Sequence, residues 1–199
     1  MPEEVRATRR RGDDLVHAIH EAALAETVEH GVGRLTMEGI ARRAGTAKTS
    51  LYRRWSTPED IVIEALYRVY PREEPSPAAD DLRGDLIRAL QLMRDSIMSS
   101  QYGAALGALL EESRRRPDLH ERLYGEVFGP RGGRFTRSVL EHYAQHGHLD
   151  AARLTPVVVD IGEALLIKYA IDTFDPPDDD YVAAIVDQVI LPAVGVANP

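Results

Sequence analysis

The chain has 199 residues, of which 44% are hydrophobic, and a formal net charge of −8 at pH 7. This length and apolar content predict one large folded domain, or a small domain fused to a larger one, and exclude a disordered chain. The absence of cysteine excludes disulfides, thiolate metal sites and cysteine nucleophiles. Neither a secretory signal nor an apolar stretch of about 18 residues that could span a membrane is recognisable. We therefore expect a cytoplasmic protein that contacts no membrane.

The charge is unevenly distributed along the chain. Residues 57–199 are strongly acidic, whereas residues 34–55 contain six Lys or Arg side chains and a single acid, Glu38. A protein that binds nucleic acid needs a basic surface for the phosphates. The acidic remainder would repel DNA and leave this one basic segment to face it.

The N-terminal region predicts an arm followed by a helix. Residues 1–12 lack apolar periodicity, which predicts a flexible basic arm. Its arginines, Arg9 to Arg11, could enter a minor groove of DNA, or the arm could be a disordered tail. From Asp13 the pattern becomes helical, and Gly31 marks the end of this first helix.

Two short helices are predicted next, in the segments LTMEGIARRAG and TAKTSLYRRW. Thr36 is a natural N-cap, the apolar residues that follow it have helical spacing, and Gly45 ends the first short helix after about two turns. The second short helix, Lys48–Trp55, must begin just past the glycine. This pattern predicts a helix-turn-helix.

A fourth helix and a domain boundary follow. Thr57 as N-cap, Pro58 at the first helical position and Asp60 facing the cap predict a helix that runs to about Tyr70. The segment 71–81 is rich in proline and acid, which predicts a boundary between two domains. Further helices are expected at residues 82–99, 102–115, 117–128, 134–146, 156–174 and 179–194. With no alternating strand pattern, the predicted fold is all-α.

The helix predicted at Lys48–Trp55 would be about 12 Å long, which matches the width of a B-DNA major groove. Leu51 and Trp55 are expected to pack inward. The side chains left to face outward can donate hydrogen bonds to base edges and phosphates: Lys48, Thr49, Ser50, Tyr52, Arg53 and Arg54. The alternative is a solvated charged face on a small helical bundle.

The segment LTMEGIARRAGTAKTSLYRRW followed by TPEDIVIEAL resembles the helix-turn-helix of TetR-family transcriptional regulators. The resemblance is close over about residues 13–66 and looser beyond them. It implies an all-α homodimer with an N-terminal three-helix DNA-binding domain and connecting fourth helix (13–70) and a larger C-terminal effector-binding and dimerisation domain (71–199). It further implies a repressor that binds double-stranded palindromic operator DNA and is released by a small-molecule effector.

The resemblance also implies roles for single residues. It assigns Thr36 and Tyr52 to phosphates and Lys48, Thr49, Ser50, Arg53 and Arg54 to the groove. Ala47 replaces a capping serine, so Thr46 is expected to cap the recognition helix and to join the DNA-binding set. Pro58 replaces a lysine that commonly binds phosphate. Glu26 and Thr27 replace larger apolar residues, which predicts loose packing of the first helix.

The last two predicted helices carry more apolar residues than one buried face requires. A helix that is apolar over much of its circumference is buried on more than one side, which a partner subunit or a purely intramolecular core could provide. The resemblance favours a homodimer through these two helices, with Gly162 permitting close approach.

An effector pocket is expected among aromatic, methionine and leucine side chains of the C-terminal region, although such residues are more often plain core. The candidates are Leu90, Met93, Met98, Tyr102, Leu106, Leu110, Phe128, Phe135, Tyr143 and Tyr169. The identity of the effector is not encoded in the pattern.

Other chemistry is not favoured. His142 and His146 could clasp a metal, but histidines also suit the C-terminal end of a helix. Nothing resembles a hydrolase triad or a di-iron motif. We expect no catalytic residue, metal or cofactor. The rival hypothesis is an all-helical enzyme or ligand-binding adaptor whose helix-turn-helix no longer touches DNA.

Overall fold

A computed structural model describes residues 3–98, 100–131 and 134–196, with side chains from residue 12 onward except that of residue 131. Throughout these ranges the regular backbone is helical and no strand occurs, which confirms the all-α prediction. None of the described helices is long and apolar enough to cross a membrane.

The chain packs as two compact units. The first comprises Met1–Tyr70 and Gln101–Pro130, and the second comprises Pro71–Ser100 and Arg131–Pro199. The chain enters the second unit at Pro71, where the proline-rich and acidic segment begins. Residues 101–130 return to the first unit, which no compositional signal indicates. The functional division into domains 13–70 and 71–199 remains a prediction.

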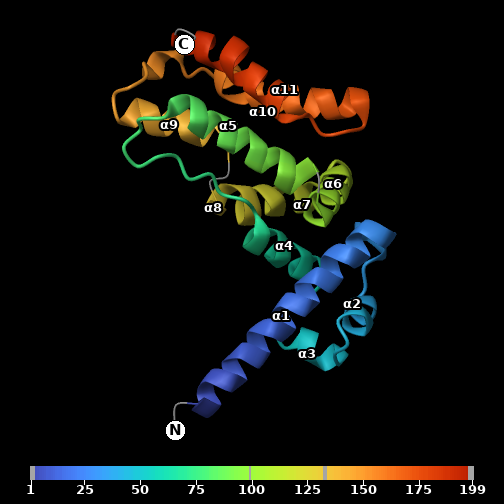
Figure 1. Cartoon of the computed structure of the whole chain (residues 1–199). Helices are drawn as coiled ribbons and strands as arrows, with labels where there is room; N and C mark the ends of the chain where they lie inside the picture. The colour runs from blue at the N-terminus through green and yellow to red at the C-terminus, as the bar shows by residue number, and fades with distance from the viewer. Residues whose placement is uncertain (1–2, 99, 132–133, 197–199) are drawn as a thin grey trace. The chain divides into compact units, whose positions relative to one another are not determined.

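The first unit is built around the long helix α1, which packs against α4, α6 and α2 (Figure 1). Its elements are α1 (Glu3–His30), the 3-10 turn η1 (Val32–Arg34), α2 (Met37–Arg43), α3 (Lys48–Tyr52), α4 (Pro58–Val69), α6 (Gln101–Ser113), α7 (Pro117–Arg122) and the π-helical turn η3 (Leu123–Phe128). Its core includes the fully buried side chains of Ile19, Ile40, Leu51, Ile61, Leu66, Leu109, Leu119 and Leu123. The short helix α8 (Gly129–Arg131) follows η3 at the unit boundary.

Helix α1 begins earlier than the sequence predicts. It starts at Glu3, before the expected cap at Asp13. Glutamate, arginine and alanine are good helix formers, so the backbone can be helical here without an apolar face. The side chains of residues 1–11 lie outside the described part of the structure. The predicted basic arm, with Arg9 to Arg11, therefore remains a prediction.

The second unit packs helices α5, α9, α10 and α11 around one apolar core. Its elements are α5 (Leu82–Met93), η2 (Arg94–Met98), α9 (Thr136–Gln145), the 3-10 turn η4 (Ala151–Arg153), α10 (Pro156–Thr173), α11 (Asp179–Ile185), η5 (Val186–Ile190) and α12 (Leu191–Ala193). The predicted helices 82–99, 117–128 and 179–194 thus exist, but each contains a π-helical turn (η2, η3 and η5). Such a turn shifts the hydrogen-bond ladder by one residue, which apolar periodicity does not reveal.

A buried hydroxyl fixes the segment 71–81 to the second unit. The Tyr143 hydroxyl donates to Asp85 (2.7 Å) and accepts from the Asp81 backbone N–H (2.8 Å). Burial by itself would raise the pKa of Asp85, but hydrogen bonds from Tyr143, Ser76 and Arg88 outweigh it and hold the pKa below the ordinary value. Tyr143 therefore acts as an anchor between α9, α5 and the segment before α5.

Gly162 allows close packing of helices inside the second unit. A Cβ atom there would lie 2.9 Å from Ile190 Cδ1 and 3.1 Å from Thr136 Cγ2, so the glycine lets α10 pack closely on η5 and α9. The expectation that it opens α10 to a partner subunit is wrong, because its own chain already fills that space.

Candidate nucleic-acid interface

The helix-turn-helix forms from local signals. The Thr36 hydroxyl caps α2 by accepting from the Gly39 N–H at 3.0 Å, as predicted. The buried residues Met37 and Ile40 fix α2 to the core of the first unit. Gly45 adopts φ +64°, a left-handed conformation that favours glycine, and turns the chain from α2 into α3.

The recognition helix is shorter than predicted. Helix α3 spans Lys48–Tyr52, and Arg53 is its C-cap. Trp55 N–H still donates to the Leu51 carbonyl at 3.0 Å, so the chain keeps one more turn after the helix. Leu51 and Trp55 are buried, as predicted, and they fix the inner side of this segment.

The predicted DNA-contacting side chains of this segment lie on its outer side. Lys48, Thr49, Tyr52, Arg53 and Arg54 are exposed, and Ser50 is half-buried. Arg53 and Arg54 make no ion pair or side-chain hydrogen bond within the described residues, so their guanidinium groups are available for a partner.

Lys48 is held only weakly. Its ammonium lies 3.2 Å from Glu38 and 6.0 Å from the centre of the Tyr52 ring. An exposed ion pair contributes about 1 kcal/mol at most and is screened by salt. A phosphate can therefore compete with Glu38 for this lysine.

Thr46 does not cap α3. The N-cap residue is Ala47, and no side chain makes the cap hydrogen bond. The prediction of a Thr46 cap is wrong, because the backbone places the helix start one residue later than a Thr46 cap requires. Thr46 is half-buried, and its place in the DNA-binding set stays a prediction.

Two polar residues of α1 are well packed, contrary to expectation. Glu26 is only 5% exposed and accepts from Arg43 Nε at 2.7 Å. Thr27 is fully buried and donates to the Ala23 carbonyl at 2.8 Å. The predicted loose packing is wrong, since hydrogen bonds satisfy the buried polar atoms.

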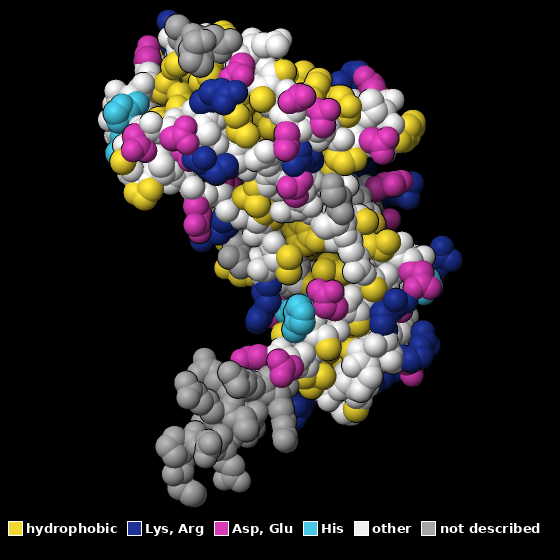
Figure 2. Space-filling model, in the orientation of Figure 1, with side chains coloured by type: hydrophobic (Ala, Val, Ile, Leu, Met, Phe, Trp, Pro, Cys, Tyr) yellow, Lys and Arg dark blue, Asp and Glu magenta, His cyan; other side chains and the backbone are white. Residues whose placement is uncertain are grey.

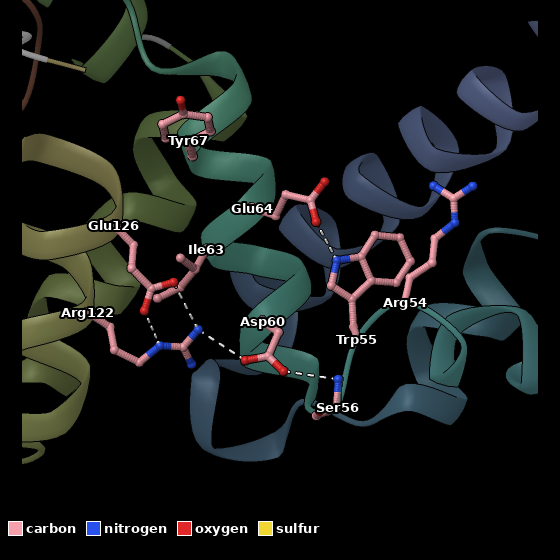
Figure 3. A pocket seen from close by; sticks show the side chains of 9 residues that line it. All are labelled: Arg54, Trp55, Ser56, Asp60, Ile63, Glu64, Tyr67, Arg122 and Glu126. Carbon is pink, nitrogen blue, oxygen red and sulfur yellow. Dashed lines mark hydrogen bonds and ion pairs between the residues drawn. The ribbon is translucent and has the colours of Figure 1, made fainter. Parts of the chain in front are cut away.

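The end of the recognition segment is bound to α4 and α1. Trp55 Nε1 donates to Glu64 Oε2 at 2.6 Å (Figure 3). The His20 ring meets the indole edge-on, with the ring centres 5.8 Å apart. Burial lowers the pKa of His20 to about 4, so this imidazole is neutral at pH 7. A movement of α4 would therefore displace Trp55 through its hydrogen bond to Glu64.

The first turn of α4 is fixed by a capping box and an arginine. Thr57 accepts from the Asp60 N–H, and Asp60 accepts from Thr57 and Ser56, which confirms the predicted start signal. Figure 3 shows Arg122 between Asp60 and Glu126, with Nη2 3.0 Å from Asp60 Oδ1. An open hollow of about 440 Å³ lies here, lined by Arg54, Trp55, Ser56, Asp60, Ile63, Glu64, Tyr67, Arg122 and Glu126.

Asp60→Ala should lower the free energy of unfolding by about 1 kcal/mol, because it removes the reciprocal cap and the Arg122 contact. Trp55 is the chain's single tryptophan, so urea unfolding followed by its fluorescence reports on this region. The control is Glu121→Ala, at an exposed acid of α7. An unchanged urea midpoint for Asp60→Ala would contradict this role.

The predicted effector residues are divided between the two units. Leu90, Met93, Phe135 and Tyr143 belong to the core of the second unit, Met98 packs against that core, and the Tyr169 ring lies 4.5 Å from that of Tyr181. Tyr102, Leu106, Leu110 and Phe128 belong to the first unit. The candidates therefore do not form one cluster within either unit, and their role in binding stays a prediction.

The histidines near the end of α9 contact backbone carbonyls. His142 Nε2 lies 2.9 Å from the Ser76 carbonyl, and His146 Nδ1 lies 2.9 Å from the His142 carbonyl. These contacts favour the helix-end interpretation over a metal clasp. Among the described residues, Glu26, Glu29 and His30 are close enough to share an ion, but Arg43 pairs with both carboxylates.

Comparison with known proteins agrees with this geometry. Residues 19–65 match the family model described as bacterial regulatory proteins, tetR family, and residues 76–189 match the tetracyclin repressor-like C-terminal domain. An HTH-type transcriptional regulator of Mycobacterium bovis is 30% identical over 166 residues, covering 83% of this chain and 81% of the relative. The DNA-binding transcriptional repressor TetR of Mycobacteroides abscessus is 25% identical over 186 residues, covering 91% and 94%.

Solved structures share the fold. The TetR family transcription regulator SCO0332 superposes with a TM-score of 0.59 at 21% identity, covering 89% of this chain and 97% of that one. The fatty acid degradation regulator FadR from Bacillus halodurans superposes with a TM-score of 0.60 at 15% identity, covering 91% and 95%.

Proposed function

The chain belongs to the TetR family of bacterial transcriptional regulators, and on that premise we propose that it is a repressor that binds a palindromic operator as a homodimer and is released by a small-molecule effector. DNA binding and regulation, rather than catalysis, are the activity of this family. The finer features (repression, dimer, palindrome and effector) are our proposal, as is action in the cytoplasm, where the operator lies.

The observation that carries the DNA-binding role is the pair Arg53 and Arg54. Both guanidinium groups are exposed beside α3 and have no acidic partner among the described residues, in a chain whose net charge is −8. Arginine is the side chain best suited to bidentate contacts with guanine and phosphate. The buried Leu51 and Trp55 hold this segment in place.

Arg53→Ala should weaken binding to the operator by about 1–3 kcal/mol, because a base-contacting arginine supplies that much discrimination. The measurement is a mobility shift on the DNA upstream of the gene, at several salt concentrations. Arg72→Ala, at an exposed arginine of the second unit, is the matched control. Equal binding by both variants, or no salt-sensitive binding by the wild type, would favour an adaptor that does not touch DNA.

Dimerisation is supported by an apolar stripe on α10. Val157, Ile167 and Ile171 are 73%, 46% and 64% exposed, and Phe174 at its C-cap is 91% exposed. Helical spacing places them on one face, while Val159 and Leu166 on the opposite face are buried in the unit. A partner subunit that covers the exposed face would bury α10 on both sides.

A two-fold dimer would present two recognition segments. Half-sites one helical turn apart, about 34–36 Å, would then be read together, which predicts a palindromic operator. An effector that binds better when this spacing is lost would shift the population and release the DNA. The Mycobacteroides abscessus relative, named a repressor, supports repression as the direction of control.

A further inference from the structure

Three consecutive arginines, Arg114 to Arg116, connect α6 to α7. The backbone here forms a tight turn, with the Arg115 N–H donating to the Glu112 carbonyl at 2.9 Å. The three side chains differ in their surroundings. Arg116 is bound by two acids, whereas Arg114 and Arg115 are exposed.

Arg116 of this turn and Arg122 of α7 form ion pairs with the first turn of α4. Arg116 Nη1 lies 3.2 Å from Glu59 Oε1, and Arg122 pairs with Asp60 at 3.0 Å. Glu59 and Asp60 form the first turn of α4, which directly follows the recognition segment. The turn is thus held close to the N-terminus of α4.

The ion pairs of Arg116 and Arg122 leave out Arg114 and Arg115, the two exposed arginines of the turn, beside which lie the acids Glu111 and Glu112. Arg114 has no ion pair within the described residues, and the side chain of Arg115, 73% exposed, approaches Glu112 only at 4.0 Å. Both line an open hollow of about 400 Å³ with Gly107, Leu110 and Glu111. Figure 2 shows basic and acidic side chains interspersed on the surface of the first unit, although residues 57–199 are acidic as a whole.

We propose that Arg114 and Arg115 bind phosphates of the operator backbone outside the bases read by the recognition segment. This inference rests on the proposed DNA-binding function and extends the interface to the α6–α7 turn. It supplies backbone contacts beside the start of α4, where Pro58 offers no cationic side chain. Because phosphates carry no sequence information, the contacts add affinity and orientation rather than specificity.

The test is the double variant Arg114→Gln/Arg115→Gln in the full-length protein. For each arginine that binds a phosphate, its removal should make the slope of log K against log salt concentration less steep by about 0.9. The ratio of affinities for operator and scrambled DNA should stay unchanged. Arg72→Gln/Arg153→Gln, at exposed arginines of the second unit, removes the same charge elsewhere and should leave the slope as in the wild type.

Two outcomes overturn the proposal: a wild-type slope in the α6–α7 variant, or an equal loss of slope in both double variants, which would indicate a general effect of net charge. The proposal would also be overturned if the double variant kept the wild-type salt slope and changed only how anionic small molecules affect operator binding. That result would assign the hollow to a free anion. Failure of the proposed function is distinguishable, because the wild type itself would then bind no operator.

Discussion

Replacing Ile167 and Ile171 by glutamate is expected to turn a dimer into a monomer and to weaken operator binding at least about a hundredfold. The two side chains are among the exposed apolar residues of α10. Losing their burial would cost about 1.5 kcal/mol or more each, and every 1.4 kcal/mol is tenfold in the dissociation constant. A charge within an apolar interface adds a desolvation cost. A monomer reads one half-site and loses the joint binding of two.

Sedimentation velocity measures the mass of the particle, and titration of labelled operator measures its affinity. The matched control is Val69→Glu, which places a charge at an exposed apolar residue of α4 and should leave a dimer. Circular dichroism verifies that the variants keep their helices. If the double variant stayed a dimer and bound the operator with unchanged affinity, α10 would not be part of the dimer interface.

Replacing Glu163 by glutamine is expected to abolish a loss of stability that the wild type shows between about pH 4.5 and pH 7. Burial raises the pKa of Glu163 from its ordinary 4.5 to about 7. Between these two pH values the folded protein therefore keeps the Glu163 proton, whereas the unfolded chain has released it. The contribution of this protonated carboxyl to the free energy of unfolding is complete below pH 4.5 and is lost as the pH rises through 7. A shift of this size corresponds to about 3 kcal/mol.

The surroundings of Glu163 explain why glutamine suits the site. Thr136 donates a hydrogen bond to Glu163, which opposes the rise in pKa, as does the charge of Arg137. Asp160 and Glu73 add negative charge that raises it further. Glutamine keeps the acceptor for Thr136 and cannot ionise.

Urea unfolding at a series of pH values measures this effect as the difference between wild type and variant. Taking the difference removes the contribution of groups such as Asp85, whose lowered pKa acts in the opposite direction. Glu121→Gln, at an exposed glutamate of α7, is the control. Parallel curves for the wild type and Glu163→Gln would show that the carboxyl titrates normally.

The sequence by itself determined the helices and most of their ends. Thr36, Gly45 and the Thr57–Asp60 box act on neighbouring backbone groups, so their signals are local and legible in the chain. It also determined the inward pair Leu51 and Trp55, and hence which side of the recognition segment is exposed.

Only the tertiary structure decided which segments that are distant in the sequence pack against one another and pair their charges. It packs residues 101–130 with the DNA-binding helices, pairs Glu26 with Arg43, and fills the space at Gly162 with the same chain. It also ends α3 at Tyr52 and bonds the buried Trp55 to Glu64 of α4. Such contacts depend on long-range packing, which the periodicity of a single segment does not contain.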